Sequence, residues 1–267
     1  MTQIKVTLED VLGDDLSPVK DAKVSFDADE TVTPKVWETV DYGAFSRLQP
    51  ILTDAQKGLI RYLVRGMPTA EYDGILAELT SGNVSTLRAS KLLWKFRKTP
   101  IHAAPFGHSY LKFTVEAPVF VVRQLIKHEY LRTSEISRRY VKGKPEYFVP
   151  DNWASIAAEV KQGAGGPLDH DKNDLAMTLA VHAIDTSDRI YSEMLKFVAP
   201  EEARMILPLC HMTRWRWSGS LDAVMNMCCL RLDDHAQSQT REVARQIGGY
   251  VKRLFPQSWA SYVEGDV

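Results

Sequence analysis

The chain has 267 residues, of which 45% are hydrophobic and 25% charged, so it can bury a sizeable core as one large domain or two small ones. Its net charge of -1 and pI near 6.7 give no overall basic field of the kind that favours nucleic acid. Three cysteines without a CxxC pair favour neither a disulfide framework nor a zinc site, and the N-terminal segment lacks a signal-peptide pattern. We therefore expect a cytoplasmic protein that binds neither nucleic acid nor membrane and holds no metal.

The first third of the chain gives the weakest patterns. Apolar Ile4, Val6 and Leu8 alternate with polar neighbours, which predicts a half-buried strand, and the sequence AKVSFDAD at residues 22–29 predicts a second one. From Thr31 to Arg97 the chain is first polar and then helical in pattern. We predict helices at TDAQKGLIRYLVRGM and TLRASKLLWKF, with TSGNVS as the loop between them.

The rest of the chain shows clearer periodicity. HSYLKFTVEAP alternates apolar and polar residues and predicts a strand, after which a helix should begin at Pro118, where the missing N–H costs nothing. A long amphipathic helix is predicted over residues 175–198. A further helix should begin at Pro200, and the last should run from near Leu221 towards Leu254, with GGY as the point where it could break. Strands and helices are mixed, which indicates an α+β or α/β fold.

One stretch, HEYLRTSEISRRY at residues 128–140, is unusually rich in polar groups. In a helix that begins at Pro118, Gln124, Lys127 and His128 share one face, while Val121, Val122 and Leu125 pack inward. In an extended segment Glu135, Ser137 and Arg139 would point the same way. Such groups suit a nucleotide site, since Arg grips phosphate and Glu and Ser bind a sugar or base. A solvated helix end with surface ion pairs is the alternative, and spacing alone does not separate the two.

The sequence RQLIKHEYLRTSEISRRY resembles the signature of the flavin-dependent thymidylate synthases, R-H-R-x-x-S-x-N-E-x-S-x-R-Y. Three further segments agree in order: DLSPVKDAKVSFD, TPIHAAPFGHSYLKFTVEAPVFVVRQ and ARMILPLCHMTRWRWSGSLDAVMNMCCLRLDDHAQ. The resemblance implies an α+β fold with an α/β core, in which a mixed or antiparallel sheet is flanked by long helices. It further implies a single domain over residues 1–267, with an enlarged helical segment at about 28–98.

The resemblance also implies an activity. Members of the family methylate dUMP to dTMP with methylenetetrahydrofolate as one-carbon donor and FAD reduced by NADPH, and they form homotetramers with shared active sites. They need no protein nucleophile, which accords with Cys228 and Cys229 in an apolar helical stretch, where a core role is expected. His182 on its apolar stripe is also expected in the core. His102 and His108 lack a nearby acidic partner, so we assign no metal.

Site residues follow from the same resemblance. Arg231 matches the Arg held responsible for uracil N3 ionisation and is the expected catalytic residue, because a guanidinium stabilises negative charge on the pyrimidine. Residues that match dUMP-binding positions are Gln124, Lys127, Glu135, Ile136, Ser137, Arg138, Arg139, Arg204 and Arg231. Residues that match FAD-binding positions are His102, Ala104, Lys127, His128, Glu129, Ser220 in the predicted SGSL turn, and Asn226.

The chain also departs from the family pattern. Lys127-His128-Glu129 replaces Arg-His-Arg, Arg132 replaces the signature Ser, and Ser134 replaces the Asn. Glu129 inverts a charge expected near the flavin, and Arg132 could pair with it across one helical turn. A divergent enzyme that makes hydroxymethyl-dUMP or a dCMP product therefore remains an alternative, as does a non-catalytic nucleotide-binding paralogue.

Overall fold

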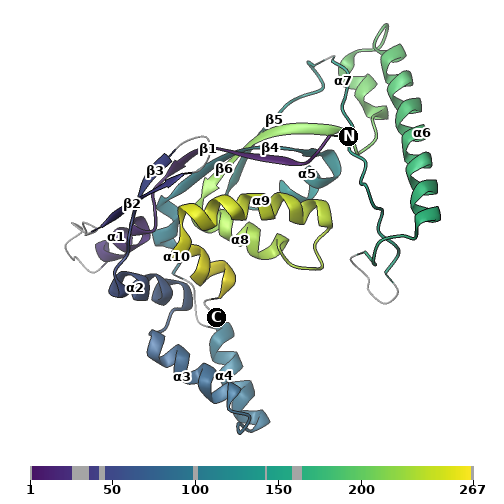
Figure 1. Ribbon diagram of the computed structural model, residues 1–267. Coiled ribbons are helices and arrows are strands. Elements are labelled where there is room, and N and C mark those ends of the chain that lie inside the picture. Colours follow the sequence, from purple (N-terminus) through teal and green to yellow (C-terminus); the bar gives the residue numbers. More distant parts are fainter. Residues whose placement is uncertain are drawn as a thin grey trace. The chain divides into compact units, whose positions relative to one another are not determined.

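A computed structural model describes residues 2–25, 36–41, 46–98, 102–141, 143–157 and 164–265 (Figure 1). By its contacts the chain divides into two compact units, each assembled from three segments. Unit 1 comprises Met1–Asp10, Lys112–Gly219 and Met227–Ile247, and unit 2 comprises Val11–Leu111, Ser220–Asn226 and Gly248–Val267. The single domain over residues 1–267 stays a prediction. The fold is mixed α and β with an antiparallel sheet, which confirms the predicted α+β class.

The main sheet has the strand order β1-β4-β6-β5, with β1 at Lys5–Leu12, β4 at Tyr110–Pro118, β6 at Met212–Ser220 and β5 at Leu131–Glu135. The alternation that predicts strands at the N-terminus and before Pro118 is confirmed. Val6 and Leu8 of β1 are buried, as are Leu111, Phe113 and Val115 of β4. In β6 the buried Trp215 and Trp217 alternate with exposed arginines, so the sheet has one apolar and one polar face.

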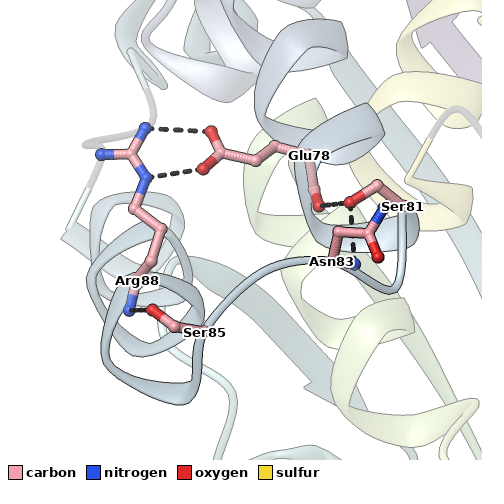
Figure 2. A network of polar contacts seen from close by, with 5 residues as sticks. All are labelled: Glu78, Ser81, Asn83, Ser85 and Arg88. Carbon is pink, nitrogen blue, oxygen red and sulfur yellow. Dashed lines mark hydrogen bonds and ion pairs between the residues drawn. The ribbon is translucent and has the colours of Figure 1, made fainter.

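Unit 2 contains the helices of the enlarged segment, α2 at Asp54–Arg65, α3 at Thr69–Thr80 and α4 at Thr86–Lys98. A capping box between Thr53 and Gln56 starts α2. Figure 2 shows how α3 and α4 are joined: both oxygens of Glu78 accept hydrogen bonds from Arg88, at 2.6 and 2.9 Å. The Ser81 hydroxyl donates to the Glu78 carbonyl and fixes the loop. The two predicted helices are confirmed as α2 and α4, whereas α3, which lies between them and leads into TSGNVS, was not predicted.

Two features of this segment differ from prediction. Residues 22–24 of the predicted strand end the helix α1 (Leu16–Val24), because Leu16, Val19 and Ala22 are buried at helical spacing; residues 26–29 lie outside the described residues. The hairpin of β2 (Trp37–Asp41) and β3 (Ser46–Pro50) was not predicted, since β2 is exposed and lacks alternation.

Unit 1 carries α5 at Val119–Leu125, α6 at His170–Met194 and α7 at Pro200–Ala203, followed by the 3-10 turn η2 at Arg204–Ile206. The helix start at Pro200 is confirmed. Around Tyr191, α6 packs on Ala203 and Leu207, yet Leu175 and Leu179 of its predicted apolar face are about 60% exposed. The expected core position of His182 is wrong for the same reason, because its side chain is exposed.

Near the C-terminus, α8 (Leu221–Arg231) and α9 (Ser238–Leu254) are separate helices, followed by α10 (Pro256–Trp259) and the π-helical turn η3 (Ala260–Glu264). The predicted single helix therefore breaks at residues 232–237 rather than at GGY, which lies within α9. The predicted SGSL turn is instead the junction of β6 and α8. No helix in the described ranges is both long and apolar enough to cross a membrane.

Candidate active site

A cavity of about 830 Å³ lies within unit 1 and is the candidate active site. Gln124 from the last turn of α5 and Arg231 at the end of α8 line it together. The rings of Phe120 and Phe148, 6.2 Å apart and tilted by 58°, form an apolar wall. The predicted neighbourhood of Gln124 and Arg231 is therefore present, with aromatic surface beside it that could bind a base.

The charged side chains that line the cavity are Arg231, Arg241 and Asp234. Arg241 donates to the Asp234 carboxylate at 2.9 Å and to the carbonyls of Asp234 and Ala236. This pair cancels, so the lining keeps one net positive charge, that of Arg231. A cavity with such a lining favours an anionic ligand.

The amide of Gln124 is held by two residues, Gln237 just before α9 and Thr240 in its first turn. Thr240, which is fully buried, donates its hydroxyl proton to Gln124 Oε1 at 3.2 Å, and Gln124 Nε2 donates to Gln237 Oε1. The orientation of the amide is therefore fixed before any ligand binds, which reduces the entropy that binding would cost.

Arg231 is held by the signature histidine. Its Nε donates to Nε2 of His128 at 2.8 Å. Burial, with the Arg231 charge as second cause, lowers the pKa of His128 to about 4, so the imidazole is neutral at physiological pH. Lys127 and His128 do not continue the predicted helical face, because α5 ends at Leu125; the His128 N–H instead donates to the Leu125 carbonyl in a turn.

The second half of the signature lies elsewhere in unit 1. Glu135 ends β5, accepts a hydrogen bond from the Thr213 hydroxyl at 2.8 Å, and lines a separate cavity of about 500 Å³ with Ile136. The charged residues of that cavity are three glutamates and two arginines, a net charge of -1: Glu9, Glu116, Glu135, Arg214 and Arg216. Within one chain, Glu135 and Ile136 are therefore not joined to Gln124 and Arg231.

The predicted extended run of Glu135, Ser137 and Arg139 stops at Glu135. Ser137 opens a turn, in which its carbonyl accepts from the N–H of Tyr140. Two of the remaining cations lie near α7. Arg139 forms an ion pair of 3.5 Å with the Glu201 carboxylate, and Arg204 Nε donates to the Glu201 carbonyl.

Arg138 instead donates to the Gly143 carbonyl, so it serves the turn that follows β5. Six of the predicted nucleotide residues thus lie at three places in this chain: Gln124 and Arg231 at the large cavity, Glu135 and Ile136 on the sheet face, and Arg139 and Arg204 at α7. Lys127, Ser137 and Arg138 belong to none of the three.

Four of the expected flavin positions belong to unit 2. The His102 ring stacks on Tyr62 of α2, with centroids 5.8 Å apart, and its backbone N–H donates to Leu63. Ala104 starts the 3-10 turn η1 (Ala104–His108). Within this unit, Tyr262 contacts Phe106 of η1 through its ring and donates its hydroxyl proton to Asn226 Oδ1 at 3.1 Å.

Ser220 is placed by its neighbour in the chain, since the N–H of Leu221 bonds to the carbonyl of Ser109, which directly follows η1. Ala104, Ser220 and Asn226 are therefore all connected to η1 or to the residue that follows it, within unit 2.

Lys127 and Glu129 are exposed in unit 1, and so is Arg132. The predicted pairing of Glu129 with Arg132 across a helical turn is wrong, because Arg132 lies in strand β5 and the described residues contain no ion pair between the two. Tyr130 between them has φ 63, a left-handed conformation that turns the chain from α5 into β5. Its carbonyl would lie 2.8 Å from a Cβ on Gly219, so that position requires glycine.

The cysteines are poorly suited to nucleophilic catalysis. Burial raises the pKa of the thiols of Cys210 and Cys228, which disfavours the reactive thiolate. Cys228 is fully buried as expected, whereas Cys229 is exposed and the expectation of a core role for it is wrong. In the described part of the chain no three His, Cys, Asp or Glu residues are grouped as metal ligands would be.

Comparison with known proteins decides the family. The family model described as "Thymidylate synthase complementing protein" matches residues 75–257. The chain belongs to this family. Among its relatives, the flavin-dependent thymidylate synthase of Thermosipho africanus is 33% identical over 164 residues, 61% of this chain and 72% of that protein. The enzyme of the same name from Thermus thermophilus is 35% identical over 180 residues, 67% of this chain and 66% of that protein.

Solved structures of the thymidylate synthase complementing protein fold agree. Two crystal structures of the UMP/dUMP methylase PolB from Streptomyces cacaoi, bound with 5-Br UMP and 5-Br dUMP, each superpose with a TM-score of 0.68 over 98% of this chain. They cover 96% and 97% of the PolB chain, with sequence identities of 23% and 25%. The resemblance predicted from the signature is therefore confirmed at the level of family and fold.

Several residues of the site were not predicted. Phe148, Arg241 and Thr240 lie far in sequence from Gln124 and contribute only through tertiary packing. The sequence LDDHAQ between α8 and α9 does carry a signal, because its polar residues interrupt a helical pattern. Tyr262 lies beyond the segment that the family model matches, and nothing local marks it as a partner of Asn226.

Proposed function

We propose that the protein methylates dUMP to dTMP, with methylenetetrahydrofolate as one-carbon donor and FAD reduced by NADPH, in the cytoplasm. The observation that carries the proposal is the cavity in which Gln124 and Arg231 meet beside an aromatic wall. Membership of the family and relatives named flavin-dependent thymidylate synthase support the reaction type.

Arg231 is the proposed catalytic residue. Carbon 5 of uracil becomes nucleophilic as negative charge develops on the pyrimidine, and a guanidinium in a partly buried cavity stabilises that charge. His128 accepts a hydrogen bond from Arg231 without cancelling its charge, because the imidazole is neutral. Gln124, fixed by Thr240 and Gln237, supplies a polar contact to the nucleotide.

The residues at the expected flavin positions are a fitting donor set for FAD, with one exception. In unit 2, the imidazole of His102, the hydroxyl of Ser220 and the amide of Asn226 can bind the acceptor-rich flavin. In unit 1, the exposed Lys127 can bind a phosphate, whereas Glu129 is unfavourable near one. When bound, FAD would supply the hydride that reduces the transferred one-carbon group.

We further propose a homotetramer with shared active sites. Within one chain Glu135, Ile136, Arg139 and Arg204 lie apart from Gln124 and Arg231, so these four residues would act on a site completed by another copy. Apolar side chains of Leu175, Leu179 and Phe197 are at least 60% exposed in unit 1, which favours burial in an assembly. Light scattering at micromolar concentration should give about four chain masses, and a mass near the 30.2 kDa of one chain would contradict this.

The reaction is tested with purified protein, FAD, NADPH, methylenetetrahydrofolate and dUMP, with mass spectrometry of the nucleotide. We expect dTMP. A hydroxymethyl product would favour the divergent enzyme, and nucleotide binding without turnover would favour the non-catalytic paralogue. The same assay with dCMP should give no product, since cytosine has no N3 proton to lose.

UMP is a second candidate substrate. The structural relative PolB is a UMP/dUMP methylase with structures bound to 5-Br UMP and 5-Br dUMP. Parallel assays with UMP and dUMP at equal concentration decide the preference, and methylation of UMP alone would overturn dUMP as the primary substrate.

A further inference from the structure

The hydrogen bond between Arg231 and His128 joins two residues that the family resemblance assigns to different ligands. Arg231 lines the large cavity, whereas His128 is not among its lining residues. The imidazole therefore contacts Arg231 from outside the cavity, through Nε at 2.8 Å. The two terminal nitrogens of the guanidinium have no protein partner among the described residues and remain available for a ligand.

His128 is itself held in place by the core. Its backbone N–H donates to the carbonyl of Leu125, a fully buried residue at the end of α5, and Ile126 donates to Val122 one turn earlier. The imidazole thus extends from a fixed point next to Gln124. Because Arg has several rotatable bonds, a fixed acceptor at Nε removes much of its freedom and preorganises the fork.

The acceptor is neutral, and this matters for the charge of the cavity. A carboxylate at the position of His128 would form an ion pair with Arg231 and cancel the one uncompensated charge among the described residues of the lining. A neutral imidazole with a free lone pair at Nε2 accepts the hydrogen bond and leaves the positive charge in place. It also fixes the tautomer, since the proton must then reside on Nδ1.

We infer that His128 is a positioning residue for Arg231, which holds the guanidinium towards the nucleotide and preserves its charge. This inference rests on the proposed uracil-nucleotide function of the same cavity. It gives His128 a task within the protein that contact with a flavin does not require.

Three substitutions separate geometry from charge. In H128Q a neutral oxygen can take the place of Nε2, so dUMP affinity of the flavin-free protein should stay within about threefold of the parent. In H128E the acceptor is kept but the charge of Arg231 is cancelled, and dUMP affinity should fall on the order of tenfold or more. H128A should lower kcat more than it raises KM, because Arg231 then loses its orientation in the transition state.

Equal affinity of H128E and H128Q would overturn the inference, as would parental binding and turnover by H128A. Thermal unfolding of all three variants provides the control, because a merely structural role would change stability without distinguishing Glu from Gln.

A measurement without substrate keeps this inference separate from the proposed function. In ¹⁵N-histidine-labelled protein, the His128 signals, assigned by their loss in H128Q, should show Nε2 unprotonated in the parent and a mixture of tautomers in R231L. Unchanged signals in R231L would refute the hydrogen bond. If instead the signals change as expected but no pyrimidine nucleotide binds, the positioning holds and the proposed function fails.

Discussion

Two cavities of unit 1 contain arginines in opposite electrostatic settings. Arg231 lines the larger cavity and is bonded to a neutral imidazole, so the lining keeps one positive charge. Arg216 lines the smaller cavity on the sheet face, where it forms an ion pair with Glu9. Glu9 also accepts from the Thr114 hydroxyl, and this bond, followed by Arg216, holds the pKa of its carboxyl below the usual range.

The difference shows why the number of arginines alone does not mark a nucleotide site. On the sheet face the acids outnumber the bases, and the arginine is already satisfied by a carboxylate. In the larger cavity Asp234 is satisfied by Arg241, which leaves Arg231 for a ligand. The arginines also differ in their partner, which is the neutral imidazole of His128 for Arg231 and the Glu9 carboxylate for Arg216.

Removal of Arg231 should have the largest effect. We expect R231A to lower kcat/KM for dUMP by on the order of 100-fold, or about 3 kcal/mol, since preorganised electrostatic groups contribute this much to transition states. Steady-state kinetics of the FAD-loaded protein measure it. R216A is the matched control: its exposed ion pair contributes at most about 1 kcal/mol to folding, and its kcat/KM should stay within about threefold of the parent.

If R231A and R216A lost activity equally, the distinction between the two cavities would be wrong. R231K offers a finer test, because lysine keeps the charge and loses the planar fork, so its activity should lie between those of the parent and R231A.

Asp15 of unit 2 is a buried acid whose hydrogen bonds are all made within the protein. It is 4% exposed and accepts hydrogen bonds from the N–H groups of Gln257 and Ser258 and from the Ser258 hydroxyl. Burial outweighs these bonds and raises the pKa of Asp15 to about 6. The folded state therefore binds a proton that the unfolded state releases between about pH 4 and 6, so this contribution to stability is lost as pH rises.

Urea unfolding of the parent and D15N at pH 4 and pH 7 tests this assignment. From pH 4 to pH 7 the free energy of unfolding of the parent should fall by on the order of 2–3 kcal/mol relative to that of D15N. A stability difference that does not change with pH would mean that Asp15 has an ordinary pKa in the folded protein.

Glu129 should give the smallest effect. It is exposed, and Arg132 does not pair with it, so its repulsion of a flavin phosphate is screened by solvent. We expect E129R to tighten FAD binding by about threefold to tenfold. The effect of R132S on FAD affinity should be the same in the parent and in E129R, so the two substitutions should be additive. Flavin fluorescence titrations of the two single variants and the double variant measure this. Strong coupling between the two substitutions would show that they interact in the FAD-bound protein.

The parts of the fold that could be predicted from sequence are those with strong local patterns. The alternation in β1 and β4 was sufficient to predict these strands, because burial on one face leaves a period in the sequence. Pro200 was sufficient to predict the start of α7. The exposed hairpin of β2 and β3 leaves no such period, and neither does α1, where Ala22–Val24 resemble a strand.

The site was predicted only in part, through the family resemblance. The resemblance predicted Gln124, His128 and Arg231 as site residues. In the structure Gln124 and Arg231 line one cavity, and Arg231 donates a hydrogen bond to His128. Helical spacing failed at Lys127 and His128, since α5 ends at Leu125 and the N–H of His128 donates to the Leu125 carbonyl in a turn. Phe148 and Arg241 line the cavity, and Thr240 holds Gln124, through contacts between distant segments that no local pattern reveals.

Hydrogen–deuterium exchange on dUMP binding tests the assignment of the cavity most directly, because it reports on both cavities in one experiment. We predict slower exchange in peptides that cover residues 120–128 and 231–241, with residues 7–9 and 114–116 of the sheet face changed less. Protection confined to the sheet-face peptides, with none around Gln124 and Arg231, would contradict the assignment of the larger cavity as the nucleotide site.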